Sequence, residues 1–243
     1  MENRKGELTT TQLITIIVLI VSFVVLLYFF FRLNLGATSN SEICHNSVIL
    51  KSKGGGLAGD LQCKSDYVCI SGGEKCSGVN PTISVNVDPN AKTEVLKAIA
   101  DQMANCWYTF GEGKISYASA KGVGDQVCAV CSVVSFDSKI QSVSYKDLID
   151  YLANTQKSNA QTYLQYLYGR SLEDFLKIPD VAAFYNSETI DAGSQYVIVT
   201  GSSKGAAFNL FGGGQVLAVV ILKSSQMQQY LGSNCPQFVT KAS

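Results

Sequence analysis

The longest apolar run of the chain extends from Leu13 to Phe31 and contains no charged residue. A helix of this length spans about 28 Å, which is close to the ~30 Å hydrocarbon core of a membrane. A strand is disfavoured because strands rarely exceed about ten residues and because lipid leaves their backbone groups unpaired. The run therefore predicts one transmembrane helix over residues 13–31, preceded by a short cytoplasmic tail over residues 1–12. The alternative, a cleaved signal peptide, usually has a shorter apolar core and a small-residue cleavage site.

The next segment, residues 32–80, is rich in glycine, serine, lysine and asparagine and has only short apolar pieces such as Ser47–Leu50. Such a composition is too poor in hydrophobic residues for a core of its own. It does contain four cysteines, and each disulfide typically contributes about 2 to 4 kcal/mol of stability. The pattern predicts a disulfide-knit stalk held by Cys44, Cys63, Cys69 and Cys76.

From residue 81 to residue 243 the pattern is that of an α/β (α+β) domain with a mixed sheet. Asp88 and Pro89 are typical of a helix start, and apolar residues at spacings of three and four predict that this helix continues to about Phe110, before Gly111. Further helices are expected near residues 145–154, 159–168 and 171–177. The expected strands are Thr82–Val87, Gln126–Phe136, Gln195–Thr200 and Gln215–Leu222, the last two as a pair.

All eight cysteines follow the apolar run. An even set on one side of a membrane helix indicates an oxidising compartment on that side. We therefore expect the N-terminus to be cytoplasmic and the C-terminal domain extracytoplasmic, in a single-pass protein of the cell membrane. Buried free thiols are the alternative. The sequence leaves the pairing open among Cys44, Cys63, Cys69, Cys76, Cys106, Cys128, Cys131 and Cys235.

Charge and histidine content exclude several classes of function. The 19 basic and 19 acidic residues cancel, so no broad field favours nucleic acid. His45 is the single histidine and is expected in a solvated loop of the stalk. Its isolation excludes Ser-His-Asp and Cys-His hydrolysis and most zinc sites. The sequence thus predicts no catalytic residue, no cofactor, no metal and no small-molecule ligand.

Cys128 and Cys131 have the spacing of a thiol-disulfide redox motif. Such a motif normally opens a helix, whereas here the following residues continue a strand. Residues three apart on a strand point to opposite faces. The favoured interpretation is two separate structural bridges, one to Cys106 and one to Cys235. An extracytoplasmic thiol-disulfide oxidoreductase that uses Cys128 and Cys131 remains an alternative.

Three other groups of residues are candidate sites. Asp101 and Glu112 are candidates for an acid and a base, although catalysis by paired carboxylates requires a fixed separation. The glycine-rich pieces Gly111–Lys114 and Gly201–Gly205 do not match a phosphate-binding loop and are expected to be turns. Aromatic residues that could form a recognition surface cluster in two places: Trp107, Tyr108 and Phe110, and Tyr163, Tyr166 and Tyr168. The spacing of Trp107 and Phe110 predicts that these two pack in the core, and partial burial is the alternative for the three tyrosines.

The sequence Arg4–Thr9, followed by the apolar run, resembles archaeal class III prepilin-type signals. The resemblance implies cleavage after Gly6 and a pilin-like filament subunit, although Thr11 stands where pilins usually carry a glutamate. The overall plan of anchor, cysteine-rich stalk and domain is similar to uncharacterised archaeal single-pass surface proteins. The leading hypothesis is a membrane-anchored cell-envelope protein with structural or protein-interaction roles toward other envelope proteins, and not an enzyme.

Overall fold

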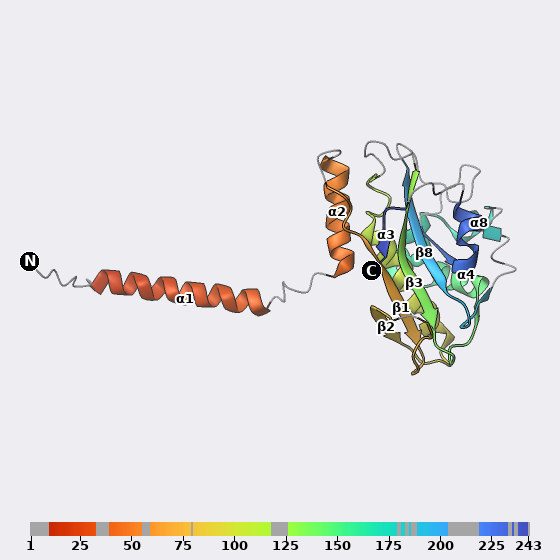
Figure 1. Cartoon of the computed structure of the whole chain (residues 1–243), viewed down its shortest axis with the longest axis horizontal. Coiled ribbons are helices and arrows are strands. Elements are labelled where there is room, and N and C mark those ends of the chain that lie inside the picture. The colour runs from red at the N-terminus through yellow and green to blue at the C-terminus, as the bar shows by residue number, and fades with distance from the viewer. Residues whose placement is uncertain are drawn as a thin grey trace, which may run out of the picture. The chain divides into compact units, whose positions relative to one another are not determined.

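The computed structural model describes most of the chain, in two units that we treat separately, Met1–Ser39 and Asn40–Ser243 (Figure 1). The described residues are 10–32, 39–54, 59–78, 80–117, 126–178, 181–182, 185, 189–203, 219–232, 235 and 238–242. The predicted processing site after Gly6 and residues 215–218 of the last expected strand lie outside them. Processing after Gly6 therefore stays a prediction.

The first unit contains one helix, α1 (Thr10–Arg32). Within the described part of the chain, no helix has both the length and the apolar character needed to cross a membrane. The prediction of a transmembrane helix over residues 13–31 is therefore wrong.

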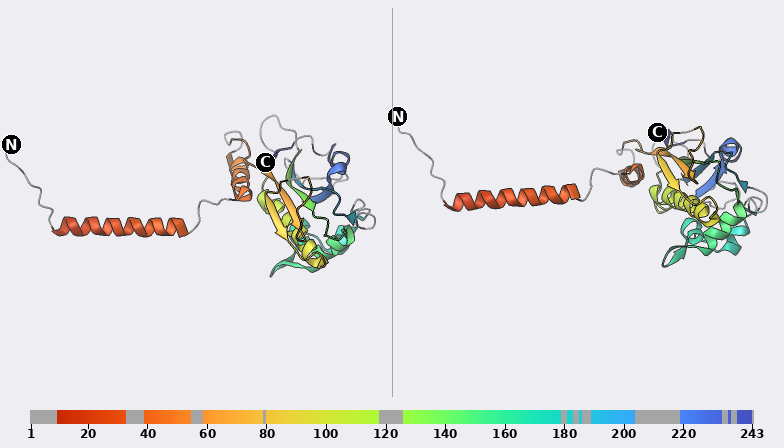
Figure 2. Two further views of the ribbon diagram at one scale, coloured as in Figure 1. Left: turned by 60° about the horizontal axis from the view of Figure 1, so that its bottom comes forward. Right: turned by 90° about the horizontal axis from the view of Figure 1, so that it is seen from below.

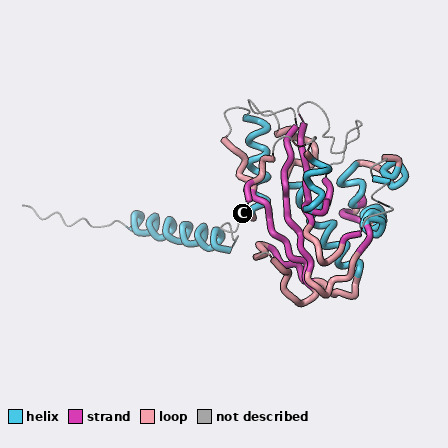
Figure 3. Tube along the Cα trace, turned by 45° about the vertical axis from the view of Figure 1, so that its right-hand side comes forward, coloured by secondary structure: helices cyan, strands magenta, loops and turns pink. Residues whose placement is uncertain are grey.

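The second unit is built on a mixed sheet, as expected (Figure 3). Its strand order is β10-β1-β3-β8-β9, with β2 also paired to β1. Strand β1 is parallel to β2, β3 and β10, whereas β8 is antiparallel to both β3 and β9. The strands are β1 (Lys64–Ser71), β2 (Ile83–Asn86), β3 (Gln126–Phe136), β8 (Tyr196–Ser203), β9 (Val219–Lys223) and β10 (Lys241–Ala242). Small two-stranded pairs join β4 (Val143–Ser144) to β7 (Thr189–Ile190) and β5 (Gln156–Ser158) to β6 (Gln161–Thr162).

Helices pack together beside this sheet (Figure 2). The longest of them in this unit is α3 (Lys92–Thr109), whose apolar face includes Ile99 and Met103. It begins four residues after the predicted start because the Asp88 carboxylate accepts from the N–H of Asn90 in a turn instead of capping the helix. The others are α4 (Tyr145–Asn154), α5 (Tyr163–Tyr168), α6 (Leu172–Leu176), the 3-10 helix η2 (Ser224–Gln226) and α8 (Met227–Leu231).

Local capping explains where the middle helices begin. Ser144 and Thr162 form capping boxes with Asp147 and Gln165, and Ser171 accepts from the N–H of Asp174. The predicted helices at 145–154 and 171–177 are thereby confirmed. The helix expected from residue 159 starts instead at Tyr163, because the residues before it form the β5–β6 hairpin.

The stalk interpretation of residues 32–80 is corrected by the structure. Residues from Asn40 onward belong to the domain: they form α2 (Asn40–Gly54), which packs on α3, and strand β1. The bridges Cys44–Cys63 and Cys69–Cys76 do lie in this segment. Its few apolar residues bury themselves against the domain instead of forming a separate core, as Val48, Leu61, Val68 and Ile70 show.

The other two bridges both start from β3 and confirm the interpretation of the Cys128–Cys131 motif as structural. Cys131 is bonded to Cys106 of α3, and Cys128 is bonded to Cys235 near the C-terminus. The register of β3 against β8 shifts between Val130 and Ser132, so Cys131 is the extra residue of a bulge.

The disulfides of the domain should differ in how much each one stabilises the folded state. Cys128 and Cys235 are 107 residues apart, whereas Cys69 and Cys76 are seven apart. Loop-closure entropy then predicts a loss of about 4.7 kcal/mol for the double variant C128A/C235A and about 2.4 kcal/mol for C69A/C76A. Urea unfolding of both variants measures the two losses, and each variant is the matched control for the other. A larger loss for C69A/C76A would contradict this ranking.

Candidate functional site

The first candidate site is an aromatic and charged patch, defined here as His45, Tyr108, Glu112, Lys114 and Tyr166. Tyr108 is 44% exposed near the end of α3. The His45 ring stacks on it with centroids 4.3 Å apart and planes at 11°. The Nδ1–H of His45 also donates to the carbonyl oxygen of Tyr108 at 2.8 Å. His45 is therefore a fixed residue of helix α2 and not the loop residue that the sequence predicted.

The turn after α3 positions the acidic member of this patch. Glu112 has a left-handed backbone (φ 55°) between two glycines of positive φ. A Cβ on Gly113 would lie 2.7 Å from the Trp107 ring, so this position requires glycine. The turn aims the Glu112 carboxylate at α5, where it accepts from the Tyr166 hydroxyl at 2.8 Å. Lys114 pairs with the same carboxylate.

These contacts shift the pKa of the Glu112 carboxyl and the pKa of the Tyr166 hydroxyl. The hydrogen bond from Lys114 is the main cause that holds the pKa of Glu112 below its usual value, and the Tyr166 hydroxyl acts in the same direction. Burial raises the pKa of Tyr166, and its hydrogen bond to Glu112 raises it further. The patch thus presents a carboxylate held in its charged form by a neutral tyrosine and a lysine.

The proposed pair of Asp101 and Glu112 is not brought together. The Asp101 carboxylate accepts from the hydroxyl of Tyr163 at 2.5 Å and from Lys97 at 2.6 Å. Glu112 lies beyond the end of α3, on the order of 15 Å farther along its axis. Paired carboxylates of glycosidases lie within about 10 Å of each other. The two acids form separate tyrosine–carboxylate contacts along one side of α3.

The core packing expected for Trp107 and Phe110 is confirmed. Phe110 is buried, and Trp107 is partly buried against the core. The hydroxyl of Tyr168 donates to the carbonyl oxygen of Val219 at 2.6 Å. Of the two aromatic groups, Tyr108 and Tyr166 are therefore the members that the structure joins in one patch.

A second candidate is a polar cleft of about 950 Å³ between β2 and the loop after β1. Its lining includes Lys75, Asn80, Ser84 and Asn86, whose side chains make no hydrogen bond or ion pair within the described residues. The sequence analysis did not identify this cleft. The available signal was the glycine-rich loop that Cys69 and Cys76 enclose.

Asp137, directly after β3, fixes the loop that borders the cleft. It is only 1% exposed. Its Oδ2 accepts from the hydroxyl of Ser71 at 3.1 Å, from the N–H of Gly72 at 2.7 Å and from the N–H of Glu74 at 2.8 Å. Burial by itself raises the pKa of Asp137, but these donors and the N–H of Lys139 together hold the pKa below its usual value. The carboxylate is thus the internal anchor of the loop.

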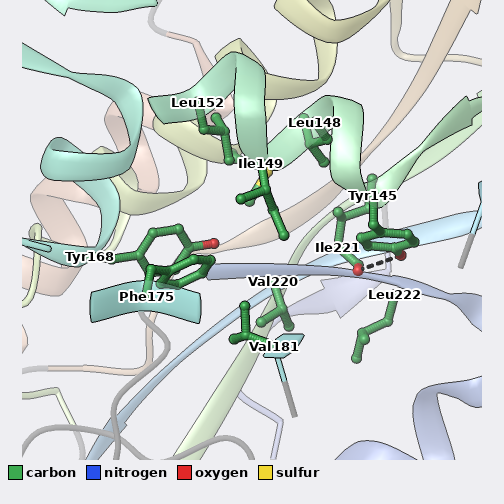
Figure 4. Close-up of a pocket in the computed structure, with 11 residues that line it drawn as sticks. Tyr145, Leu148, Ile149, Leu152, Tyr168, Phe175, Val181, Val220, Ile221 and Leu222 are labelled. Carbon is green, nitrogen blue, oxygen red and sulfur yellow. Dashed lines mark hydrogen bonds between the residues drawn. The ribbon is translucent and has the colours of Figure 1, made fainter. Parts of the chain in front are cut away.

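A third cavity is apolar and lies between α4, α6 and β9 (Figure 4). Leu148, Ile149, Phe175 and Val220 contribute to its lining, and the Tyr145 hydroxyl at its edge donates to the carbonyl oxygen of Ile221 at 2.8 Å. Its volume is about 60 Å³, well below the ~150 Å³ cavity that accommodates benzene. We interpret it as a packing void.

Possible metal ligands and thiols are the last groups to place among the described residues. No three histidine, cysteine or acidic side chains of the described ranges lie close enough to hold a metal ion. All eight cysteines are bridged, including Cys128 and Cys131. Of the glycine-rich piece at 201–205, Gly201–Ser203 belong to β8 and the rest lies outside the described residues.

Asp137 should make the stability of the domain sensitive to acid. Because its folded-state pKa lies below the unfolded value, its contribution is complete at neutral pH and is lost as the pH falls through the folded pKa. We expect D137N to lower the free energy of unfolding by about 2 kcal/mol at pH 7. At pH 3 the free energies of unfolding of D137N and the wild type should differ by less. Urea unfolding at both pH values measures this, with D60N at an exposed carboxylate as the control. An equal loss at both pH values would contradict the assignment.

Comparison with known proteins assigns no family to this chain and no function to these sites. No protein-family model, no curated protein and no solved structure matches this chain. Its function therefore has to be inferred from its own residues.

Proposed function

We propose that this chain is a disulfide-stabilised protein-interaction domain that works in an oxidising compartment outside the cytoplasm. The observation that carries the proposal is the pairing of all eight cysteines in four bridges. Bridges of this kind persist where thiols are not kept reduced, that is, in extracytoplasmic compartments. Cys106–Cys131 joins α3 to β3, Cys44 of α2 is bonded to Cys63 just before β1, Cys128 of β3 is bonded to Cys235 after α8, and Cys69–Cys76 closes the loop beside the polar cleft.

Binding is favoured over catalysis because the reactive groups are already used. Asp101 and Glu112 each accept from a tyrosine and pair with a lysine, and Asp137 accepts from the chain around it. What remains available is a rigid surface that contains an exposed tyrosine stacked on a histidine. Aromatic side chains held in one orientation give large contact area with little loss of entropy on binding. The patch around Tyr108 is therefore the best-supported interaction surface of helix α3.

The oxidised state can be tested by alkylation. We expect the protein, isolated without reductant, to gain no mass from iodoacetamide, either native or denatured, because every thiol is bonded. Reduction before alkylation should add eight groups. The denatured, unreduced sample is the control, since it separates bridged sulfur from buried free thiol. Any alkylation of that sample would contradict the proposal, and a native reaction at Cys128 or Cys131 would favour the oxidoreductase alternative.

The interaction surface can be tested by cross-linking in cells. A photoreactive amino acid at position 108 should form discrete cross-linked products with another protein, because Tyr108 projects from the patch. The same amino acid at position 173, an exposed residue of α6, is the matched control. Products that do not differ between the two positions would count against a role for this patch.

A further inference from the structure

A buried hydroxyl of strand β3 faces a small polar cavity. Ser132 is 3% exposed, and its Oγ makes no hydrogen bond within the described residues. Burying a hydroxyl without a partner costs free energy, so native proteins pair such groups with other protein atoms or with ordered water. The Ser132 side chain lines a cavity that is also bounded by α2, α3 and the start of β1. The hydroxyl therefore indicates a ligand in this cavity.

The size of the cavity limits what it can hold. Its volume is about 20 Å³, and a single water molecule requires about 10 to 15 Å³. The cavity is therefore large enough for one water molecule or one monatomic ion. It is too small for a polyatomic ligand.

Two further side chains of the lining have hydrogen-bonding groups to offer. Asp66 lies opposite Ser132 in the register of β1 against β3, so both side chains are on the same face of the sheet. The Oδ1 of Asp66 accepts from the amide of Asn40 at 3.4 Å, whereas its Oδ2 accepts from no group in the described part of the chain. The side chain of Gln102 in α3 makes no hydrogen bond in those ranges either. With Ser132 they supply the two to four polar partners that a buried water needs.

The charges around the cavity favour a neutral ligand. Its lining includes the carboxylate of Asp66 and the ammonium group of Lys64, which have opposite signs. Helix α2 begins at Asn40 in the same lining, and the N–H groups of a helix N-terminus disfavour a cation. The Asp66 carboxylate disfavours an anion. Of the ligands that fit, water is the one that these groups accommodate.

We propose that one ordered water molecule binds in this cavity to Ser132, Asp66 and Gln102. The water accepts from the Ser132 hydroxyl and donates to the Asp66 carboxylate, so it satisfies both groups. Through Gln102 it joins strands β1 and β3 to helix α3, beside the Cys106–Cys131 bridge of the same lining. The inference concerns the interior of the domain and does not depend on the proposed interaction function.

A crystal structure of the full-length chain at high resolution tests the site directly. The protein is kept in mild nonionic detergent because α1 exposes apolar side chains. We expect one density peak within about 3.2 Å of the Ser132 Oγ that also has Asp66 or Gln102 as a hydrogen-bond partner. A cavity without density would overturn the proposal. Six or more oxygen contacts of about 2.4 Å would identify a bound cation and would overturn it as well.

A stability measurement tests whether this water holds the elements together. The matched control is Ser135, a second buried serine of β3 whose hydroxyl has no partner among the described residues but which does not line the cavity. S132A should lower the urea midpoint by about 0.5 M, because it removes a water-mediated hydrogen bond. S135A removes an unpaired hydroxyl and should leave the midpoint unchanged or raise it. Equal midpoints for S132A and S135A would overturn the proposal.

Discussion

The domain depends on strand β3 and the two disulfides that leave it. Through Cys131 the strand is bonded to helix α3, and through Cys128 it is bonded to a residue 107 positions later. The mixed sheet places β3 between β1 and β8, so it also contacts early and late parts of the sequence through hydrogen bonds. Contacts between such distant segments are opposed by the entropy of closing long loops. The two covalent bonds reduce that cost at the centre of the sheet.

Side chains that resemble catalytic groups are used here to hold elements together. The Asp137 carboxylate accepts hydrogen bonds from the backbone of the loop after β1. The hydroxyls of Tyr163 and Tyr166 in α5 donate to Asp101 in α3 and to Glu112 just beyond it. A buried carboxylate such as that of Asp137 is tolerated only when its oxygens accept hydrogen bonds. The exposed members of the patch include Tyr108 and Lys114.

Tyrosine hydroxyls also close one edge of the main sheet to pairing with another strand. Tyr145 and Tyr168 occupy the outer carbonyls of β9, so this edge is closed by the chain's own helices. Strand β2 has only four residues and is held on one side by β1. The cleft beside it is bounded by a loop that Asp137 and the Cys69–Cys76 bridge keep in place. The loop therefore forms one rigid side of the cleft.

Local sequence determined much of the secondary structure. The strand Gln126–Phe136, the helices near 145–154 and 171–177 and the separate bridging of Cys128 and Cys131 were predicted, because each prediction used residues near in sequence. The membrane span was not supported, and the stalk was wrong because Val68 and Ile70 look isolated until β3 and α3 supply their neighbours. The stacking of His45 on Tyr108, the capture of Glu112 by Tyr166 and the donors around Asp137 were decided by tertiary structure alone. These contacts join residues more than fifty positions apart, and no local preference encodes such a meeting.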